Sequence, residues 1–115
     1  MRLVIALVLA ALGAGCGTAA VPVSGSLTQA QAAIRAAEEV GARSVPKAAL
    51  HLKMAQDQLQ TAKGLLADGE EEEASVVLAR AEIDAELALA LAKDANLRAQ
   101  ANEAMKKVDV LKKGE

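Results

Sequence analysis

The sequence contains no phenylalanine, tyrosine or tryptophan, and this absence excludes several classes of function. Proteins that bind single-stranded nucleic acids rely on aromatic side chains that stack on the bases. Deep pockets for small molecules are usually lined by aromatic and other large side chains. The formal net charge is −2, so the chain also lacks the basic excess that a nucleic-acid backbone attracts. We therefore expect neither a nucleic-acid partner nor a small-molecule substrate.

Residues that carry catalysis or bind metals are also scarce. His51 is the only histidine and Cys16 the only cysteine, and the sequence has no glycine-rich phosphate-binding loop. His51 lies at the edge of an apolar stripe, which indicates a solvated surface residue. The acidic run Glu70–Glu73 could suggest a metal site, but successive helical residues fan around the axis, and negative charge at a helix start is favourable in itself. We expect no catalytic residue, metal site or cofactor, and hence no enzyme.

Residues 1–15 have the three-part layout of a secretory signal peptide. Arg2 supplies a positive charge, Leu3–Leu12 is an unbroken apolar run of ten residues, and Gly13–Gly15 are small. The alternative is a transmembrane helix, which needs about 20 apolar residues to cross the hydrocarbon core. The shorter run therefore favours a signal peptide.

The stretch Leu12–Cys16 resembles the bacterial lipobox, although leucine is more usual than glycine at the position of Gly13. The resemblance implies cleavage between Gly15 and Cys16 and acylation of Cys16, for example with palmitate. The alternative is a chance free cysteine beside an ordinary cleavage site, but a lone exposed thiol is a liability in an oxidising compartment. Because Gly17 is not aspartate, the resemblance further implies anchoring in the outer membrane, with the protein facing the periplasm.

The mature chain divides into a lipid-anchored flexible tether over residues 16–25 and an Ala-rich helical domain over residues 26–115. Ser26 and Gln29 fit a capping box, which predicts a first helix over about 27–42. Pro46 suits the first turn of a second helix over about 46–68. A turn at Asp68-Gly69 precedes a third helix over about 70–112.

These elements predict an all-α fold, a three-helix antiparallel bundle or hairpin with a long, partly overhanging C-terminal helix. The first helix is expected to fold back over the second. Between residues 76 and 92, large apolar residues are spread around a wide arc of the third helix, which we interpret as facing two neighbours: Val77, Leu78, Ile83, Leu87, Leu89 and Leu91. After Lys93 the apolar surface narrows to one stripe.

Residues 46–90 resemble the Ala-rich helical domain of unknown function 4398, which occurs in bacterial envelope lipoproteins. The resemblance rests on Pro46, Ala55, Leu59, Ala62, Gly69, Ala74, Leu78, Ala81 and the run Ala81–Ala88. It implies a helical lipoprotein of the cell envelope and supplies no catalytic residues.

The C-terminal part of the third helix carries a candidate interaction seam: Leu97, Ala101, Ala104, Val108 and Leu111. The steps of 4, 3, 4 and 3 are the spacing of a coiled-coil seam. It predicts contact with a second copy of the chain or with an envelope partner; the alternative is a bend at Asp94 or Asn96 that folds the segment back. We expect a lipid-anchored, non-catalytic structural or interaction module.

A Braun-like tether between membrane and peptidoglycan is the other functional candidate, and proximity to peptidoglycan fits either role. In Braun's lipoprotein a C-terminal lysine is joined to peptidoglycan. The printed sequence ends in Gly114-Glu115, so we expect no covalent link of that kind.

Overall fold

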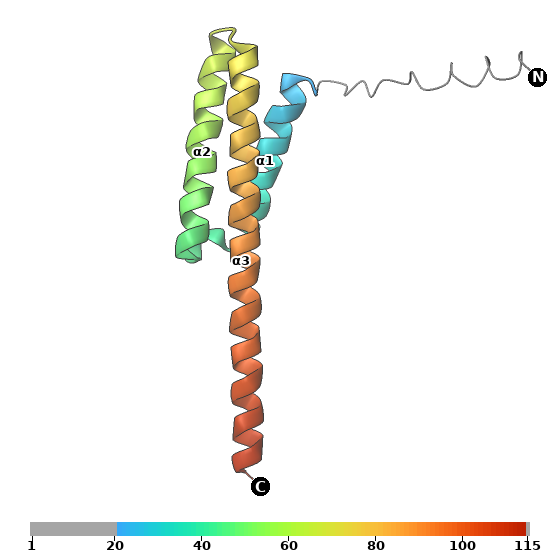
Figure 1. Cartoon of the computed structure of the whole chain (residues 1–115), viewed down its shortest axis with the longest axis vertical. Coiled ribbons are helices and arrows are strands. Elements are labelled where there is room, and N and C mark those ends of the chain that lie inside the picture. The colour runs from blue at the N-terminus through green and yellow to red at the C-terminus, as the bar shows by residue number, and fades with distance from the viewer. Residues whose placement is uncertain (1–20, 115) are drawn as a thin grey trace, which may run out of the picture.

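The computed structural model describes residues 21–114 of the chain, and these residues form three α-helices and one short 3₁₀ helix (Figure 1). The helices are α1 (Val23–Glu39), α2 (Pro46–Ala67) and α3 (Glu71–Lys113), with η1 (Ala42–Ser44) between α1 and α2. In the view of Figure 1, α3 lies between α2 and α1 and extends well beyond both. The predicted all-α fold with a long C-terminal helix is confirmed. The predicted signal peptide and Cys16 lie outside the described residues.

The first helix begins earlier than the sequence predicted. Helix α1 starts at Val23, and Ser26 lies inside it without forming a side-chain cap. The carbonyl oxygen of Pro22 accepts hydrogen bonds from Gly25 N at 2.8 Å and Ser26 N at 3.2 Å, so the first turn closes on Pro22 instead. The predicted boundary at residue 26 is therefore wrong, because residues 23–25 belong to the helix and not to the tether.

Two glycines with positive φ end the first two helices. Gly41 (φ 84°) follows α1, and its N–H donates to Glu38 O at 3.0 Å. Gly69 (φ 82°) follows α2. At that turn Glu70 N donates to Leu65 O at 2.9 Å and Gly69 N to Leu66 O at 3.2 Å. This pair of bonds is the Schellman motif, which satisfies the last carbonyls of a helix and reverses the chain into α3.

The core consists almost entirely of alanine. On α3 the buried residues follow steps of 4, 3, 4, 3 and 4: Ala74, Leu78, Ala81, Ala85, Ala88 and Ala92. Leu78 is the largest fully buried side chain among the described residues. Buried alanines let helix axes approach closely, but each removes little apolar surface from water, so the stabilisation per residue is small.

Helix α1 packs more extensively on α3 than on α2, whereas the sequence predicted that it would fold back over α2. Ala30 of α1 lies in one buried cluster with Leu78 and Ala81 of α3. Ile34 and Ala37 lie in a second buried cluster with Ala85, Ala88 and Ala92. Small residues on both α1 and α3 allow this contact. Because the chain reverses between α1 and α2 and again between α2 and α3, α1 runs parallel to α3, and its N-terminal end lies at the same end of the bundle as the α2–α3 turn (Figure 1).

Candidate interaction surface

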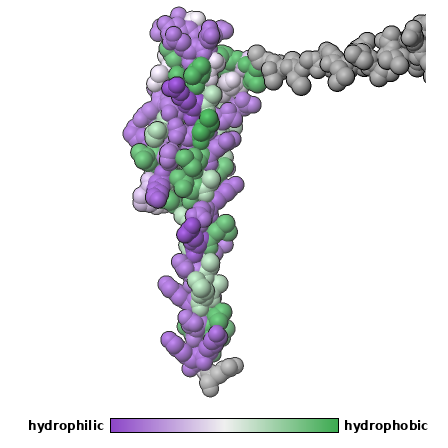
Figure 2. Space-filling model, in the orientation of Figure 1, coloured by the Kyte–Doolittle hydropathy of each residue, from purple (hydrophilic) through white to green (hydrophobic). Residues whose placement is uncertain are grey.

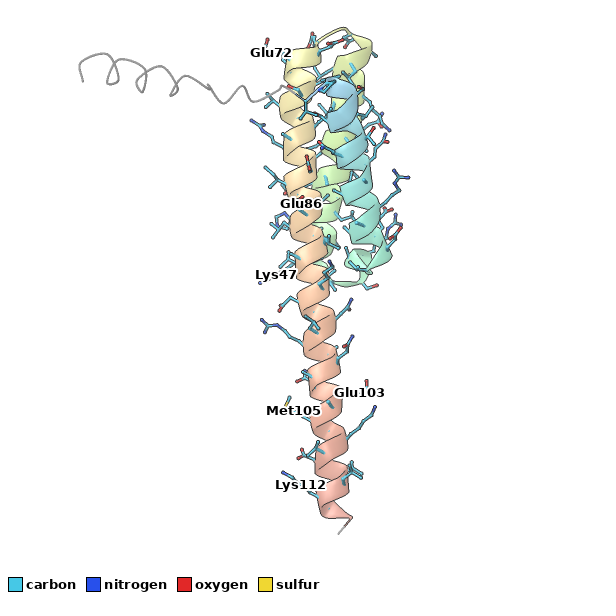
Figure 3. All side chains as sticks on the ribbon, turned by 90° about the vertical axis from the view of Figure 1, so that its right-hand side faces the viewer. Lys47, Glu72, Glu86, Glu103, Met105 and Lys112 are labelled. Atoms are coloured by element: carbon cyan, nitrogen blue, oxygen red, sulfur yellow. The ribbon has the colours of Figure 1, made fainter. Side chains whose placement is uncertain are left out.

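Among the described residues, Asn96 makes the hydrogen bond between α3 and the rest of the bundle that lies furthest along α3. Its Nδ2 donates a hydrogen bond to the carbonyl oxygen of Val40, at the end of α1, at 3.0 Å. From Leu97 to Gly114 every residue is exposed. Figure 3 shows Glu103, Met105 and Lys112 on this part of α3, beyond α1 and α2. We call residues 97–113 the overhang.

All five residues of the candidate seam are in the overhang, and all are exposed: Leu97, Ala101, Ala104, Val108 and Leu111. The exposed fractions of the larger three are 64% for Leu97, 47% for Val108 and 71% for Leu111. Helix α3 is continuous from Glu71 to Lys113, so the predicted alternative of a bend at Asp94 or Asn96 is wrong. Asp94 instead accepts a hydrogen bond from Arg98 Nε at 2.8 Å, an i,i+4 contact that a continuous helix allows.

The seam lies on the side of α3 opposite to the side that packs in the bundle. The buried stripe of α3 would continue through Ala95, Ala99, Asn102, Lys106 and Asp109. Each seam residue follows one of these positions by two residues, which is about 200° of helical rotation. The positions that continue the buried stripe are therefore polar from Asn102 on, while the five seam positions on the opposite side are apolar. Figure 2 shows that the surface of the overhang is mostly hydrophilic with separate hydrophobic patches.

Part of the arc that the sequence assigned to two neighbouring helices is exposed as well. Ile83 is 65% exposed and Leu87 41%, whereas Leu78 is fully buried. The positions of α3 that lie between the helices are held by alanines and by Leu78. The prediction that Ile83 and Leu87 face neighbouring helices is therefore wrong. The spacing could have revealed this, since Ile83 and Leu87 each follow a buried alanine by two residues.

A polar cluster joins α2 to α3 beside the core. His51 Nδ1 lies 2.9 Å from Asp84 Oδ1, and Gln58 Nε2 donates to Asp84 Oδ2 at 2.9 Å. The side chains of His51 and Asp84 are only 27% and 16% exposed, so the prediction of a solvated His51 is wrong. Sequence reasoning missed this contact because it depends on how α2 and α3 align across the turn. The three side chains fix that alignment.

The acidic run lies at the start of α3, where Glu71, Glu72 and Glu73 occupy the first turn. At this position negative charges interact favourably with the helix dipole, which is the role that the sequence predicted for the run. Within residues 21–114, no group of three histidine, cysteine, aspartate or glutamate side chains is placed to hold a metal ion. No helix in the same part of the chain is both long and apolar enough to span a bilayer.

A protein-family model described as "Domain of unknown function (DUF4398)" matches residues 25–104. The chain belongs to this family. The match covers α1 from residue 25 on, all of α2, and the part of α3 that includes the first three seam residues, Leu97, Ala101 and Ala104. No curated protein and no solved structure matches the chain closely enough to count as similar.

Proposed function

We propose that this member of the DUF4398 family is a lipid-anchored lipoprotein of the bacterial cell envelope, and that its helical domain is a non-catalytic interaction module. The observation that carries the proposal is the overhang. An isolated helix of about this length is marginal in water. A free spacer would have no need for an apolar seam on one face, whereas a contact surface for another helix would.

The anchoring part of the proposal rests on the sequence. Residues 1–15 have the layout of a signal peptide, and Leu12–Cys16 resembles a lipobox. Acylation of Cys16 would hold the module at the outer membrane, facing the periplasm, and more than one acyl chain is needed for stable anchoring. Mass spectrometry of the mature protein should find an acylated cysteine at its N-terminus. Recovery of Cys16→Ser in the membrane fraction at the wild-type level would contradict lipid anchoring.

The interaction part is tested by chemical cross-linking in cells with a seam variant, Leu97→Asp/Val108→Asp. The matched control is Ala99→Asp/Val110→Asp, which adds the same charge at exposed positions on the opposite face of the overhang. The proposal expects the seam variant to lose cross-linked species that the wild type and the control retain. Retention of every cross-linked species by the seam variant would show that the seam has no binding role.

The second candidate is a tether between membrane and peptidoglycan, resembling Braun's lipoprotein. The length of α3 favours this role, since 43 residues extend about 64 Å. Muropeptides found covalently attached to the purified protein would favour the tether over the interaction module.

A further inference from the structure

The exposed apolar residues of α3 form a second stripe that begins within the bundle. Four of them lie in the part of α3 that packs on α1 and α2, but on its exposed side. Each follows a buried alanine by two residues: Val76, Ile83, Leu87 and Ala90, after Ala74, Ala81, Ala85 and Ala88. Two residues correspond to about 200° of rotation, so this stripe lies opposite the core. We call these four residues the outer stripe.

The outer stripe is continuous with the candidate seam. From Val76 to Leu111 the apolar positions keep a heptad spacing, interrupted only by Arg80 and Asp94. A heptad pattern sustained over three to four heptads is typical of a coiled coil, and a left-handed supercoil keeps such a stripe facing its partner. The face thus has the length and spacing to pack against one long helix.

We infer that the partner is a second copy of this chain, with the two α3 helices antiparallel. The two charges that interrupt the stripe argue against the parallel arrangement. In a parallel, in-register pair, Arg80 would face Arg80 and Asp94 would face Asp94 of the other copy. Lys93 would also lie beside Arg98 of the other copy. Like charges in and beside a coiled-coil seam oppose pairing. They therefore disfavour the parallel arrangement and favour the antiparallel one.

An antiparallel pair centred between Ala88 and Leu89 makes the same charges complementary. Leu87 of one copy then faces Ala90 of the other. Arg80 lies about one helical turn from Asp94 of the other copy, where it adds a second donor to the carboxylate that Arg98 already contacts. Glu86 lies across from Lys93 of the other copy. Both pairs occur twice by symmetry, because each copy presents the same surface.

This arrangement pairs residues 73–104 of both copies over about 48 Å. It rests on the proposed function for one consequence. Since α1 starts at the same end of the bundle as the α2–α3 turn (Figure 1), the two α1 helices begin at opposite ends of the dimer. Anchoring both copies in one membrane then places the dimer with its long axis along that membrane. Residues 105–113 of each copy stay free for a further contact.

Sedimentation equilibrium tests whether the outer stripe forms the dimer interface, because it measures the dissociation constant of the dimer. The sample is the full, lipidated chain in detergent, with micelles in excess over protein. The wild type is expected to dimerise, and Ile83→Asp to weaken the dimer at least about tenfold. The matched control is Leu50→Asp on α2, where an exposed apolar residue lies outside the stripe; its dissociation constant should stay within about twofold of wild type. Thermal unfolding by circular dichroism checks that both variants fold. An Ile83→Asp dimer with the dissociation constant of the wild type would overturn the inference.

A charge exchange tests the orientation. Glu86→Lys places two like-charged pairs across the interface, and we expect the dissociation constant to rise about tenfold, which is about 1.4 kcal/mol. Adding Lys93→Glu restores opposite charges in the antiparallel arrangement and should return the constant to within about twofold of wild type. Lys93→Glu alone separates the two orientations: in the antiparallel pair it lies across from Glu86 of the other copy and should raise the dissociation constant about tenfold, whereas in a parallel pair it would lie beside Arg98 and lower the constant. A double variant that stays as weak as Glu86→Lys would overturn the antiparallel arrangement.

Failure of self-association and failure of the proposed function give different results. A wild-type chain that stays monomeric at every concentration overturns self-association, while the seam variant in cells still decides whether the overhang binds another envelope protein. A dimer that is lost in Leu97→Asp/Val108→Asp but intact in Ile83→Asp supports the overhang as an interaction surface and overturns the role of the outer stripe.

Discussion

His51 and Asp84 join the two arms of the helical hairpin: His51 Nδ1 on α2 lies 2.9 Å from Asp84 Oδ1 on α3. The second carboxylate oxygen of Asp84 accepts from Gln58, one heptad further along α2. One half-buried carboxylate thus contacts two side chains seven residues apart. In a core made of small alanines that could slide past one another, this cluster specifies how α2 and α3 align.

Removing this carboxylate should cost stability. Asp84→Ala leaves both His51 and Gln58 without their partner in a half-buried site, and we expect the free energy of unfolding to fall by about 1–3 kcal/mol. Urea denaturation followed by circular dichroism measures it. The control is Asp57→Ala, which removes an exposed i,i+4 contact with Lys53 and should cost less than about 0.5 kcal/mol. Equal losses in the two variants would contradict a special role for Asp84.

The alanine core should not accept larger side chains. Ala85 is fully buried between the helices, so Ala85→Leu must push the helices apart, with an expected loss of about 1–3 kcal/mol. Ala99→Leu makes the same change at an exposed position of the overhang and should stay within about 0.5 kcal/mol of wild type. Chemical denaturation of the two variants side by side gives the comparison. An Ala85→Leu protein as stable as wild type would show that the core is not close-packed.

Two glycines should respond to alanine in opposite directions. Gly69 has φ 82°, where alanine is strained, so Gly69→Ala should destabilise the hairpin by about 1–2 kcal/mol. Gly64 lies within α2 with no neighbouring atom within 4 Å of an added Cβ, so Gly64→Ala should stabilise the protein by about 0.5–1 kcal/mol. Thermal unfolding of both variants measures the change in Tm. A change of the same sign in both would contradict the assigned backbone geometry.

The overhang should contribute nothing to the stability of the bundle. A chain that ends after Asn96 keeps the hydrogen bond to Val40 and all the buried residues. We expect its free energy of unfolding at low protein concentration to match the full chain within about 0.5 kcal/mol, with a smaller helical signal in circular dichroism. A large loss of stability at low concentration would mean that residues 97–113 fold back on their own bundle.

The sequence predicted the three helices well because their signals are local. Pro46 begins α2, and Gly69 permits the turn before α3, so both boundaries of the hairpin lie within one residue of the prediction. The start of α1 was missed because Ser26 and Gln29 match a capping box equally well whether or not the helix has already begun at Val23.

The distribution of residues between core and surface was harder to predict. Leucine and isoleucine are usually assigned to a core, yet here all but one of the buried positions of α3 hold alanine, and Ile83 and Leu87 are exposed. The contact between His51 and Asp84 joins residues 33 positions apart and depends on the alignment of two helices, which periodicity alone does not give. By contrast, the shared side of the candidate seam residues on α3 could be predicted, because it follows from periodicity within a single helix, and their binding role stays a prediction.

Site-specific photo-cross-linking in cells decides whether one face of the overhang binds another helix. A photoreactive amino acid is placed either at Leu97, on the seam, or at Ala99, on the opposite face, in the otherwise unchanged chain. We expect a strong adduct from position 97, with the mass of two copies of the chain, and little or none from position 99. Equal adducts from both positions, or none from position 97, would contradict a binding role for that face.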